Sequence, residues 1–208
     1  GATVENITNY VNVTGIQQAA GVVGWLENNT TTFAKNCVNY GTITATSYQI
    51  GGIAGFISGA NNQISNISQC YNIGKVSSHS YAGGILGVVN KNCAAYYSIS
   101  DCYNTGEINS LIGYAGGIVA DIPNVNIKVT NTYNIGVVKI GVDPGYMISA
   151  NTVAATTKPT TNFYLNTLDA LTPVCGETAK SSDELKTLEL GENWIIDGID
   201  YPRLKVFE

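Results

Sequence analysis

Charged residues are scarce in this chain of 208 residues, since Asp, Glu, Lys and Arg together make up 12% of it, about half the usual share. The net charge is only −5, with more acidic than basic residues. A chain without a cluster of lysines and arginines cannot neutralise several nucleic-acid phosphates. Low charge combined with 44% hydrophobic residues also argues against disorder. We therefore expect a folded protein that does not bind nucleic acid.

Proline, histidine and long apolar runs are also sparse. Five prolines against 23 glycines exclude a proline-rich or collagen-like tract. No apolar run reaches the roughly 18 residues that a membrane helix needs, so we expect no membrane insertion. No signal peptide opens the chain, and its abrupt start at Gly1 is what we expect of a piece of a longer precursor. The single His79 and the lack of a Cys-x-x-Cys pair predict no zinc site, and we expect no cofactor.

What the sequence does contain is a repeat. Residues 34–55, 67–87, 99–120 and 129–150 are edited copies of one unit. The equivalent leading positions, 33, 32 and 30 residues apart, are Cys37, Cys70, Cys102 and Thr132. A Gly-Gly pair recurs with the same period at Gly52, Gly84 and Gly117. A fixed period near 32 residues indicates a stacked array in which one unit cannot bury its apolar face alone.

Each unit reads as three short strands separated by tight turns. Val, Ile, Thr and Tyr favour strands, and the Asn and Gly punctuation favours turns. We therefore expect an all-β, right-handed parallel β-helix (β-solenoid) with about five rungs of about 32 residues, spaced about 4.8 Å apart. Residues 4–26 would form an incomplete first rung, with Tyr10 and Asn12 at the positions of Cys37 and Asn39.

The pattern changes after residue 150, which divides the chain into solenoid repeats at 1–150 and a C-terminal cap at 151–208. Ser181 or Ser182 followed by acidic residues predicts the start of a short helix. Trp194 to Phe207 then reads as a closing strand or hairpin with an Asp-Gly turn. Unpaired strand edges template aggregation, so we expect this small α+β cap to cover the open end of the last rung.

These units carry a resemblance to a known family. NCVNYGTI…GGIAG, QCYNIGKV…GGILG and DCYNTGEI…GGIVA resemble GLUG-type repeats, which occur in large bacterial surface proteins and beside immunoglobulin-A-cleaving proteases. The tail GIDYPRLK (198–205) is similar to the way such arrays finish. The resemblance covers most of the chain and implies a β-solenoid, an extracellular cell-surface location and adhesion rather than chemistry. The fourth unit departs from the pattern, with Thr132 for Cys and Met147-Ile148 for Gly-Gly-Ile.

Equivalent residues of successive rungs should stack into ladders. In-register side chains lie parallel rather than facing each other, which disfavours disulfides, so we expect Cys37, Cys70 and Cys102 to be small buried hydrophobes. Cys93 would lie in a loop and Cys175 in the cap. Stacked amides can bond to one another along the axis, which predicts a second ladder at Asn39, Asn72, Asn104 and Asn134.

The candidate site is a third ladder, formed by Tyr71, Tyr103 and Tyr133. If the preceding Cys points inward, strand alternation turns these rings outward, where three stacked rings would offer a platform for glycans. The alternative is a structural stack covered by neighbouring loops. The alternation of side chains along the strand does not decide between the exposed platform and the covered stack. Ile67 and Cys70 are three residues apart, and one strand can bury both only if it contains a bulge.

No catalytic constellation is evident in the sequence. The acids Asp101, Glu107, Asp121 and Asp143 fall on different rungs, no pair recurs, and no HExxH motif is present. We therefore expect a non-catalytic, monomeric adhesion or spacer segment of a larger bacterial surface protein, whose partner would be a host or bacterial surface glycan or protein. Two alternatives stay open: a carbohydrate-binding module using the tyrosines, and an accessory domain of a surface protease or glycan-degrading enzyme.

Overall fold

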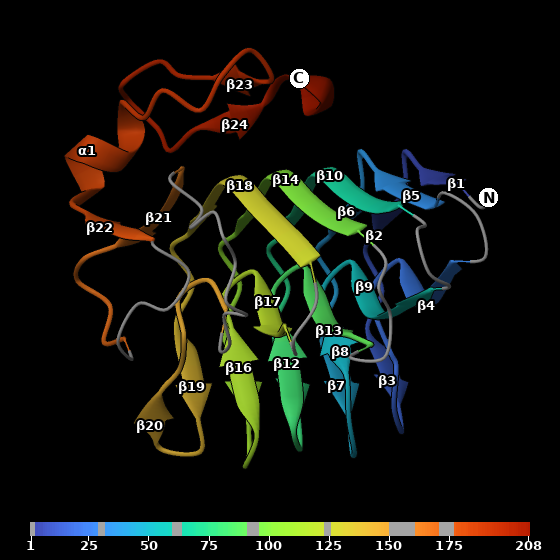
Figure 1. The fold of residues 1–208 in the computed structure, drawn as a ribbon. Coiled ribbons are helices and arrows are strands. Elements are labelled where there is room, and N and C mark those ends of the chain that lie inside the picture. Colours follow the sequence, from blue (N-terminus) through green and yellow to red (C-terminus); the bar gives the residue numbers. More distant parts are fainter. Residues whose placement is uncertain are drawn as a thin grey trace.

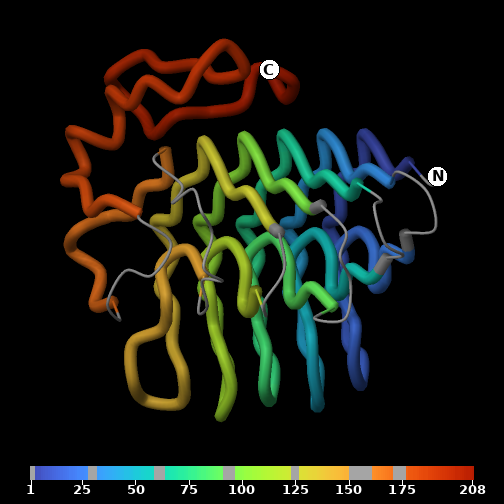
Figure 2. Tube along the Cα trace, viewed as in Figure 1, coloured from blue at the N-terminus to red at the C-terminus, as the bar shows by residue number. Residues whose placement is uncertain are grey.

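The computed structural model describes residues 3–28, 32–59, 64–90, 96–122, 126–149, 161–170 and 177–208. The chain winds into a parallel β-solenoid whose turns lie side by side (Figures 1 and 2). Each turn crosses four sheets, here named A to D. One complete turn consists of β10 (Ile64–Asn72) in sheet A, β11 (Val76–Ser78) in B, β12 (Tyr81–Gly83) in C and β13 (Leu86–Val89) in D. The predicted fold class is confirmed.

Equivalent strands of successive turns pair in parallel within each sheet. Sheet A runs β1 (Thr3–Glu5), β5 (Thr32–Lys35), β10, β14 (Tyr96–Asn104), β18 (Asn126–Asn134), β21 (Asn162–Leu165) and β22 (Thr178–Lys180), with β2 (Thr8–Asn9) and β6 (Val38–Asn39) beside this path. Sheet B runs β3 (Val13–Gly15), β7 (Ile43–Ala45), β11, β15 (Ile108–Ser110), β19 (Val138–Ile140) and β20 (Asp143–Pro144). Sheet C is β8 (Ile50–Gly51), β12 and β16 (Tyr114–Gly116), and sheet D is β4 (Val23–Asn28), β9 (Ala54–Gly59), β13 and β17 (Val119–Asp121).

The solenoid has about four full turns rather than the expected five, since sheet D contains four strands. The fifth turn begins with β18 and β19 but joins sheets C and D only through isolated bridges at Tyr146 and Ser149. This is the turn in which Met147 and Ile148 replace the Gly-Gly-Ile of the earlier units. Its β19 also pairs in antiparallel fashion with β20, which closes sheet B.

A bulge resolves the parity conflict in sheet A. Gln69 and Asp101 have φ angles of +52° and +53°, a left-handed conformation that is uncommon outside glycine. This extra residue lets both Ile67 and Cys70 face inward, and both are 0% exposed. The next side chain in the strand, Tyr71, therefore turns toward the opposite face.

Apolar side chains form three clusters. One fills the space between sheets A and D and includes Ile67, Cys70 and Leu86. A second lies between sheets B and C around Val76 and Ala82. The third lies on the outer face of sheet A, beneath the C-terminal segment.

The asparagine ladder is present and one member longer than predicted. Each Nδ2 donates to the Oδ1 of the next asparagine at 2.7 or 2.8 Å, in the order Asn9, Asn39, Asn72, Asn104 and Asn134. Asn9 pairs in register with Asn39, so the expected alignment of Asn12 with Asn39 was wrong by three residues. The Gly-Gly landmark packs against this ladder. A Cβ on Gly84, for instance, would lie 2.7 Å from Cγ of Asn104.

The cysteine prediction is confirmed for the three stacked residues, which are free and buried. Each thiol donates to the carbonyl two residues earlier, at 3.1, 3.1 and 3.2 Å, in Cys37, Cys70 and Cys102. Burial raises the pKa of the Cys70 thiol. The pKa of the Cys37 thiol is raised mainly by its hydrogen-bond contact with Cys70 and, to a smaller extent, by burial. Cys93 and Cys175 lie outside the described residues.

The C-terminal segment has the predicted elements, partly in a different place. Helix α1 (Ser182–Lys186) starts with a capping box formed by Ser181 and Glu184, and β23 (Trp194–Ile195) pairs in antiparallel fashion with β24 (Arg203–Leu204) before the 3-10 turn η1 (Lys205–Phe207). The expected position over the open end holds for part of the segment and needs correction for the rest. β21 and β22 extend sheet A beyond β18 and α1 contacts both, at that end of the solenoid, whereas β23 and β24 lie over the outer face of sheet A (Figure 1). The apolar side chains on that face supply the physical reason.

Candidate functional site

The predicted ladder of Tyr71, Tyr103 and Tyr133 exists as a stack on the outer face of sheet A. Neighbouring ring centroids lie 4.7 and 5.0 Å apart, and the ring planes differ by 5° and 4°. The left-handed residue before each cysteine position sets this direction. It interrupts the alternation of the strand by one residue, so that the cysteine faces inward like Ile67 or Ile99 and the tyrosine after it faces outward. The stacking predicted from the sequence is therefore correct.

The premise that these rings face solvent is wrong. Tyr71, Tyr103 and Tyr133 are 7%, 8% and 1% exposed. The ring of Trp194 lies 5.9 Å from that of Tyr103 and 5.7 Å from that of Tyr133, and Phe207 packs edge-on against Tyr71 at 4.9 Å. The ladder is a structural stack under the C-terminal segment, which corrects the predicted glycan platform at these three residues.

Asp101 ties that covering segment to the solenoid. Its carboxylate accepts hydrogen bonds from Trp194 Nε1 at 3.0 Å, Asn193 Nδ2 at 3.1 Å and Asn131 Nδ2 at 3.2 Å. The side chain is 9% exposed, and charge-assisted bonds of this kind are roughly twice as strong as neutral ones. Asp101 therefore anchors the C-terminal segment to sheet A. The sequence did not reveal this role, because the partner residues Asn193 and Trp194 lie more than 90 positions further along the chain.

The other acids named from the sequence remain apart. Glu107 pairs with Lys75 at 3.1 Å, and hydrogen bonding from Asn109, then from Lys75, lowers the pKa of its carboxyl. Asp121 lies in sheet D and Asp143 in β20, on different sheets. Among the described ranges, no group of three His, Cys, Asp or Glu side chains is placed to hold a metal ion.

A shallow polar groove runs along the outer face of sheet A beside the β23–β24 hairpin. Its volume is about 380 Å³, with a floor formed by β5, β10 and β14 and a wall at Asn193. Hydroxyl and amide side chains dominate the floor, with a lysine and a phenylalanine at one end: Phe33, Lys35, Asn66, Ser68, Gln69 and Ser100.

A second row of tyrosines lies on the outer face of sheet C, and the sequence reasoning missed it. Successive centroids are 6.4, 5.7 and 6.5 Å apart along Tyr48, Tyr81, Tyr114 and Tyr146. Tyr48 is 50% exposed and the other three are half-buried. We call these four residues the tyrosine row. The missed signal was a tyrosine recurring at intervals of 33, 33 and 32 residues. Only Tyr81 and Tyr114 pair in register; Tyr48 precedes β8, and Tyr146 bridges to Gly116.

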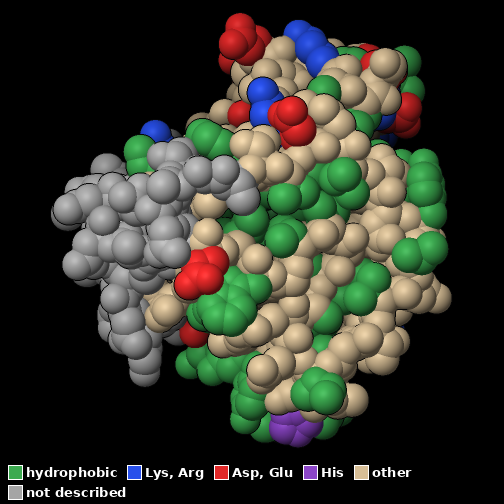
Figure 3. All heavy atoms as spheres, turned by 90° about the vertical axis from the view of Figure 1, so that its right-hand side faces the viewer, with side chains coloured by type: hydrophobic (Ala, Val, Ile, Leu, Met, Phe, Trp, Pro, Cys, Tyr) green, Lys and Arg blue, Asp and Glu red, His purple; other side chains and the backbone are tan. Residues whose placement is uncertain are grey.

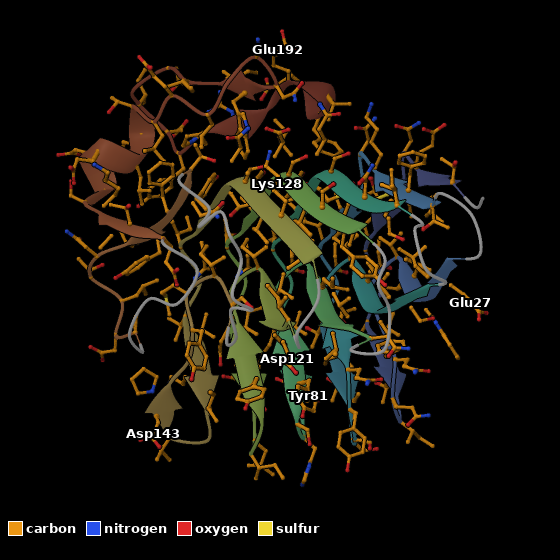
Figure 4. All side chains as sticks on the ribbon, in the orientation of Figure 1. Glu27, Tyr81, Asp121, Lys128, Asp143 and Glu192 are labelled. Carbon is orange, nitrogen blue, oxygen red and sulfur yellow. The ribbon has the colours of Figure 1, made fainter. Side chains whose placement is uncertain are left out.

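Strand alternation explains why Tyr81 and Tyr114 face outward. Ala82 and Ala115, which follow Tyr81 and Tyr114, are 0% exposed and belong to the cluster between sheets B and C. The tyrosines before them must therefore point to the other side of the sheet. Figure 4 shows Tyr81 on β12, with Asp121 of β17 above it. Burial, then the negative charge of Asp121, raises the pKa of the Tyr81 phenol.

The N-terminal end of the solenoid also exposes apolar side chains. Tyr10 is 74% exposed and stacks on Tyr40 with centroids 5.0 Å apart. Figure 3 looks onto this end, where hydrophobic side chains are spread over the turns and charged ones gather on the C-terminal segment at the top. Further exposed residues of the first turn are Ile7, Val11, Ile16 and Trp25.

The fold and its ladders define a repeat-built parallel β-solenoid, and the comparisons agree with this class. The chain is similar to a crystal structure described as a "putative immunoglobulin A1 protease from Bacteroides ovatus", with 25% sequence identity and a TM-score of 0.64. The match covers 99% of this chain but only 58% of that one. No family model matches the chain, so the GLUG-type resemblance stays a prediction. No curated protein matches either.

No helix in the described ranges is long and apolar enough to cross a membrane.

Proposed function

We propose that this chain is a non-catalytic, monomeric adhesion or spacer module of a larger bacterial surface protein, exposed outside the cell. The observation that carries the proposal is the similarity, over 99% of the chain, to a Bacteroides ovatus protein described as a "putative immunoglobulin A1 protease". Immunoglobulin A1 is found outside cells, which agrees with an extracellular location. Because the chain spans 58% of that protein, the activity of the whole neighbour is not transferred to it. The GLUG-type repeat pattern supports the same location and role.

The architecture suits a scaffold. Backbone pairing, the asparagine ladder and the cysteine ladder all run along the axis and join each turn to the next. Repeat proteins of this kind are stabilised by such neighbour contacts, which leaves their outer side chains free to vary. A module built in this way holds a binding surface at a fixed distance from whatever it is attached to.

A second candidate is an accessory domain that positions a surface protease on its substrate. The description of the structural neighbour is the specific observation in its favour. In this function the chain would bind immunoglobulin A1 or a nearby surface component without cleaving it.

The test uses the purified chain coupled to beads. Beads carrying it should be retained on epithelial cell layers or mucin above beads carrying serum albumin, and immunoglobulin A1 incubated with the chain should stay intact on a denaturing gel. Retention only on immunoglobulin-coated surfaces would favour the accessory domain. Cleavage by the chain alone would contradict the non-catalytic proposal, and retention on none of these surfaces would leave the spacer role in place of adhesion.

A further inference from the structure

We propose that Val11 is a stop residue, whose side chain closes the N-terminal end of the solenoid against the backbone of any further turn or strand. This inference rests on the monomeric form of the proposed function and gives it a physical cause. The end needs such a device, because in the described part of the chain β1, β3 and β4 are the outermost strands of sheets A, B and D. Outermost strands present unpaired backbone groups, which readily pair with another chain.

Val11 occupies a position that is glycine in the four later turns. In each of the five turns the ladder asparagine donates through Nδ2 to the carbonyl oxygen two residues later, at 2.7 to 2.9 Å. The acceptors, in chain order, are Val11, Gly41, Gly74, Gly106 and Gly136. None of them has a positive φ, so the backbone conformation does not itself require glycine. The requirement must come from packing.

The four glycines make room for the turn that precedes them. A Cβ on any of the four would overlap the carbonyl oxygen of the equivalent residue in the preceding turn, and it would lie 2.8 Å from Nδ2 of that turn's ladder asparagine. Real Cβ atoms do not approach non-bonded heavy atoms this closely. A side chain at this position is therefore incompatible with a turn stacked in front of it in register.

Val11 places a side chain in that space. It shares the local hydrogen bonds of the glycines, since Asn9 Nδ2 donates to its carbonyl oxygen at 2.8 Å and its N–H donates to Asn9 Oδ1 at 3.2 Å. Its Cβ therefore points out of the N-terminal end, and the residue is 66% exposed. Each later ladder asparagine accepts a bond from the asparagine before it. The side chain of Val11 occupies the place from which such a donor would reach Asn9.

The C-terminal end of the solenoid follows the same rule in the opposite direction. A Cβ on Gly117 would overlap the carbonyl oxygen of Met147 in the next turn and would lie 2.7 Å from Asn134 Nδ2. Met147 stands at the equivalent position of the last turn, beyond which sheets C and D have no further strand in the described ranges. Its side chain is 1% exposed and belongs to the cluster against which Leu168 packs. Glycine is thus kept between turns and replaced by a larger residue at both ends.

The experiment adds one turn in front of Val11. A copy of residues 66–97 is fused directly before Thr3, which has the same register as Ser98, and Cys93 of the copy is changed to serine. The extension then adds a single thiol, the copy of Cys70, which is buried only if the added turn docks. Labelled thiols are counted by intact mass after the native protein is treated with a thiol reagent at pH 8, with Val11 unchanged, with Val11→Ala and with Val11→Gly.

Relative to the chain without the extension, the extended chain with Val11 should gain one label. The matched control Val11→Ala keeps the Cβ and should gain one label as well, whereas Val11→Gly should gain none, because the added turn can then dock and bury its cysteine. Protection of the added thiol with Val11 or with Val11→Ala, or its labelling with Val11→Gly, would overturn the inference. Size-exclusion chromatography of the chain without the extension tests the proposed function separately: a dimer would contradict its monomeric form, while the labelling would still decide the role of Val11.

Discussion

Replacing Asn104 by alanine tests whether the asparagine ladder ties the turns together. The Asn104 amide makes four hydrogen bonds: Nδ2 donates to Gly106 O at 2.9 Å and to Asn134 Oδ1 at 2.8 Å, while Oδ1 accepts from Asn72 Nδ2 at 2.7 Å and from Gly106 N at 3.2 Å. The side chain is 0% exposed. Groups that lose these bonds therefore have no direct access to water.

The expected cost follows from this inventory. A typical buried hydrogen bond contributes a net stabilisation of about 1 kcal/mol, so losing four costs about 4 kcal/mol in the free energy of unfolding. The neighbours keep part of their bonding, which limits any further penalty. Asn72 Nδ2 still donates to Gly74 O, and Asn134 Oδ1 still accepts from Gly136 N.

Asn9→Ala is the matched control, because Asn9 is the first member of the same ladder. It donates to Asn39 Oδ1 and Val11 O and accepts from Val11 N, and its side chain is 8% exposed. Fewer bonds are lost, and those with Val11 are only partly buried, so water can replace some of them. We expect a loss of about 1–2 kcal/mol.

Urea unfolding should be followed by far-ultraviolet circular dichroism and by tryptophan fluorescence together. In a Trp25→Phe background, the fluorescence comes from Trp194, which packs on Tyr103 and Tyr133 and reports on the C-terminal segment, whereas the dichroism reports on the sheets. Stability in repeat proteins is a sum over neighbouring units, so the midpoints of the two probes show whether the loss spreads. A loss below about 1 kcal/mol for Asn104→Ala, or one equal to that of Asn9→Ala, would refute the reasoning.

Three further outcomes are expected. In the native protein at pH 8, thiol reagents should not label Cys37, Cys70 or Cys102, because all three are buried and because burial and mutual contact raise the pKa of the Cys37 and Cys70 thiols. Mass mapping after unfolding in denaturant should find the three thiols free, and a disulfide between any two would contradict this. Asp101→Ala should lower the free energy of unfolding by about 3 kcal/mol or more, since hydrogen bonds to a charged group contribute about 1.5–3 kcal/mol each. The control Glu107→Gln breaks an exposed ion pair and should change the free energy of unfolding by less than about 1 kcal/mol. Equal effects of the two variants in urea titrations would exclude the anchoring role of Asp101. A chain stopped at Thr157 should oligomerise in size-exclusion chromatography, because the loss of residues 158–208 uncovers the apolar outer face of sheet A. A monomeric and equally stable product would show that the C-terminal segment is dispensable as a cover.

The architecture could be predicted from the sequence because a solenoid places the same residue of every unit in the same environment. The ladders at Cys70 and Asn72 follow from their spacing alone. The bulge did not, although the sequence contained a signal for it. Asn and Asp tolerate the left-handed conformation better than other residues with a side chain, and four of the five positions before the cysteine site are Asn or Asp: Asn6, Asn36, Asp101 and Asn131.

The exposure of the tyrosines could not be predicted in the same way. Alternation shows that Tyr133 points away from the interior, but whether it meets water depends on residues far along the chain. Its hydroxyl donates to Pro202 O at 2.7 Å, across 69 positions of sequence. A repeat pattern contains no information about where a non-repetitive tail will dock, so the sequence alone did not decide between an exposed platform and a covered stack.

The ladder also explains why asparagine, rather than a near relative, occupies this position in five successive turns. Nδ2 of Asn72 donates both to Gly74 O in its own turn and to Asn104 Oδ1 in the next, so one side chain closes the local turn and sets the axial register. Aspartate lacks the donor and would stack charges in the interior. Serine has only one proton to share between the two acceptors. Because this inner residue fixes both geometries, replacing it should disturb the local turn and the axial register together.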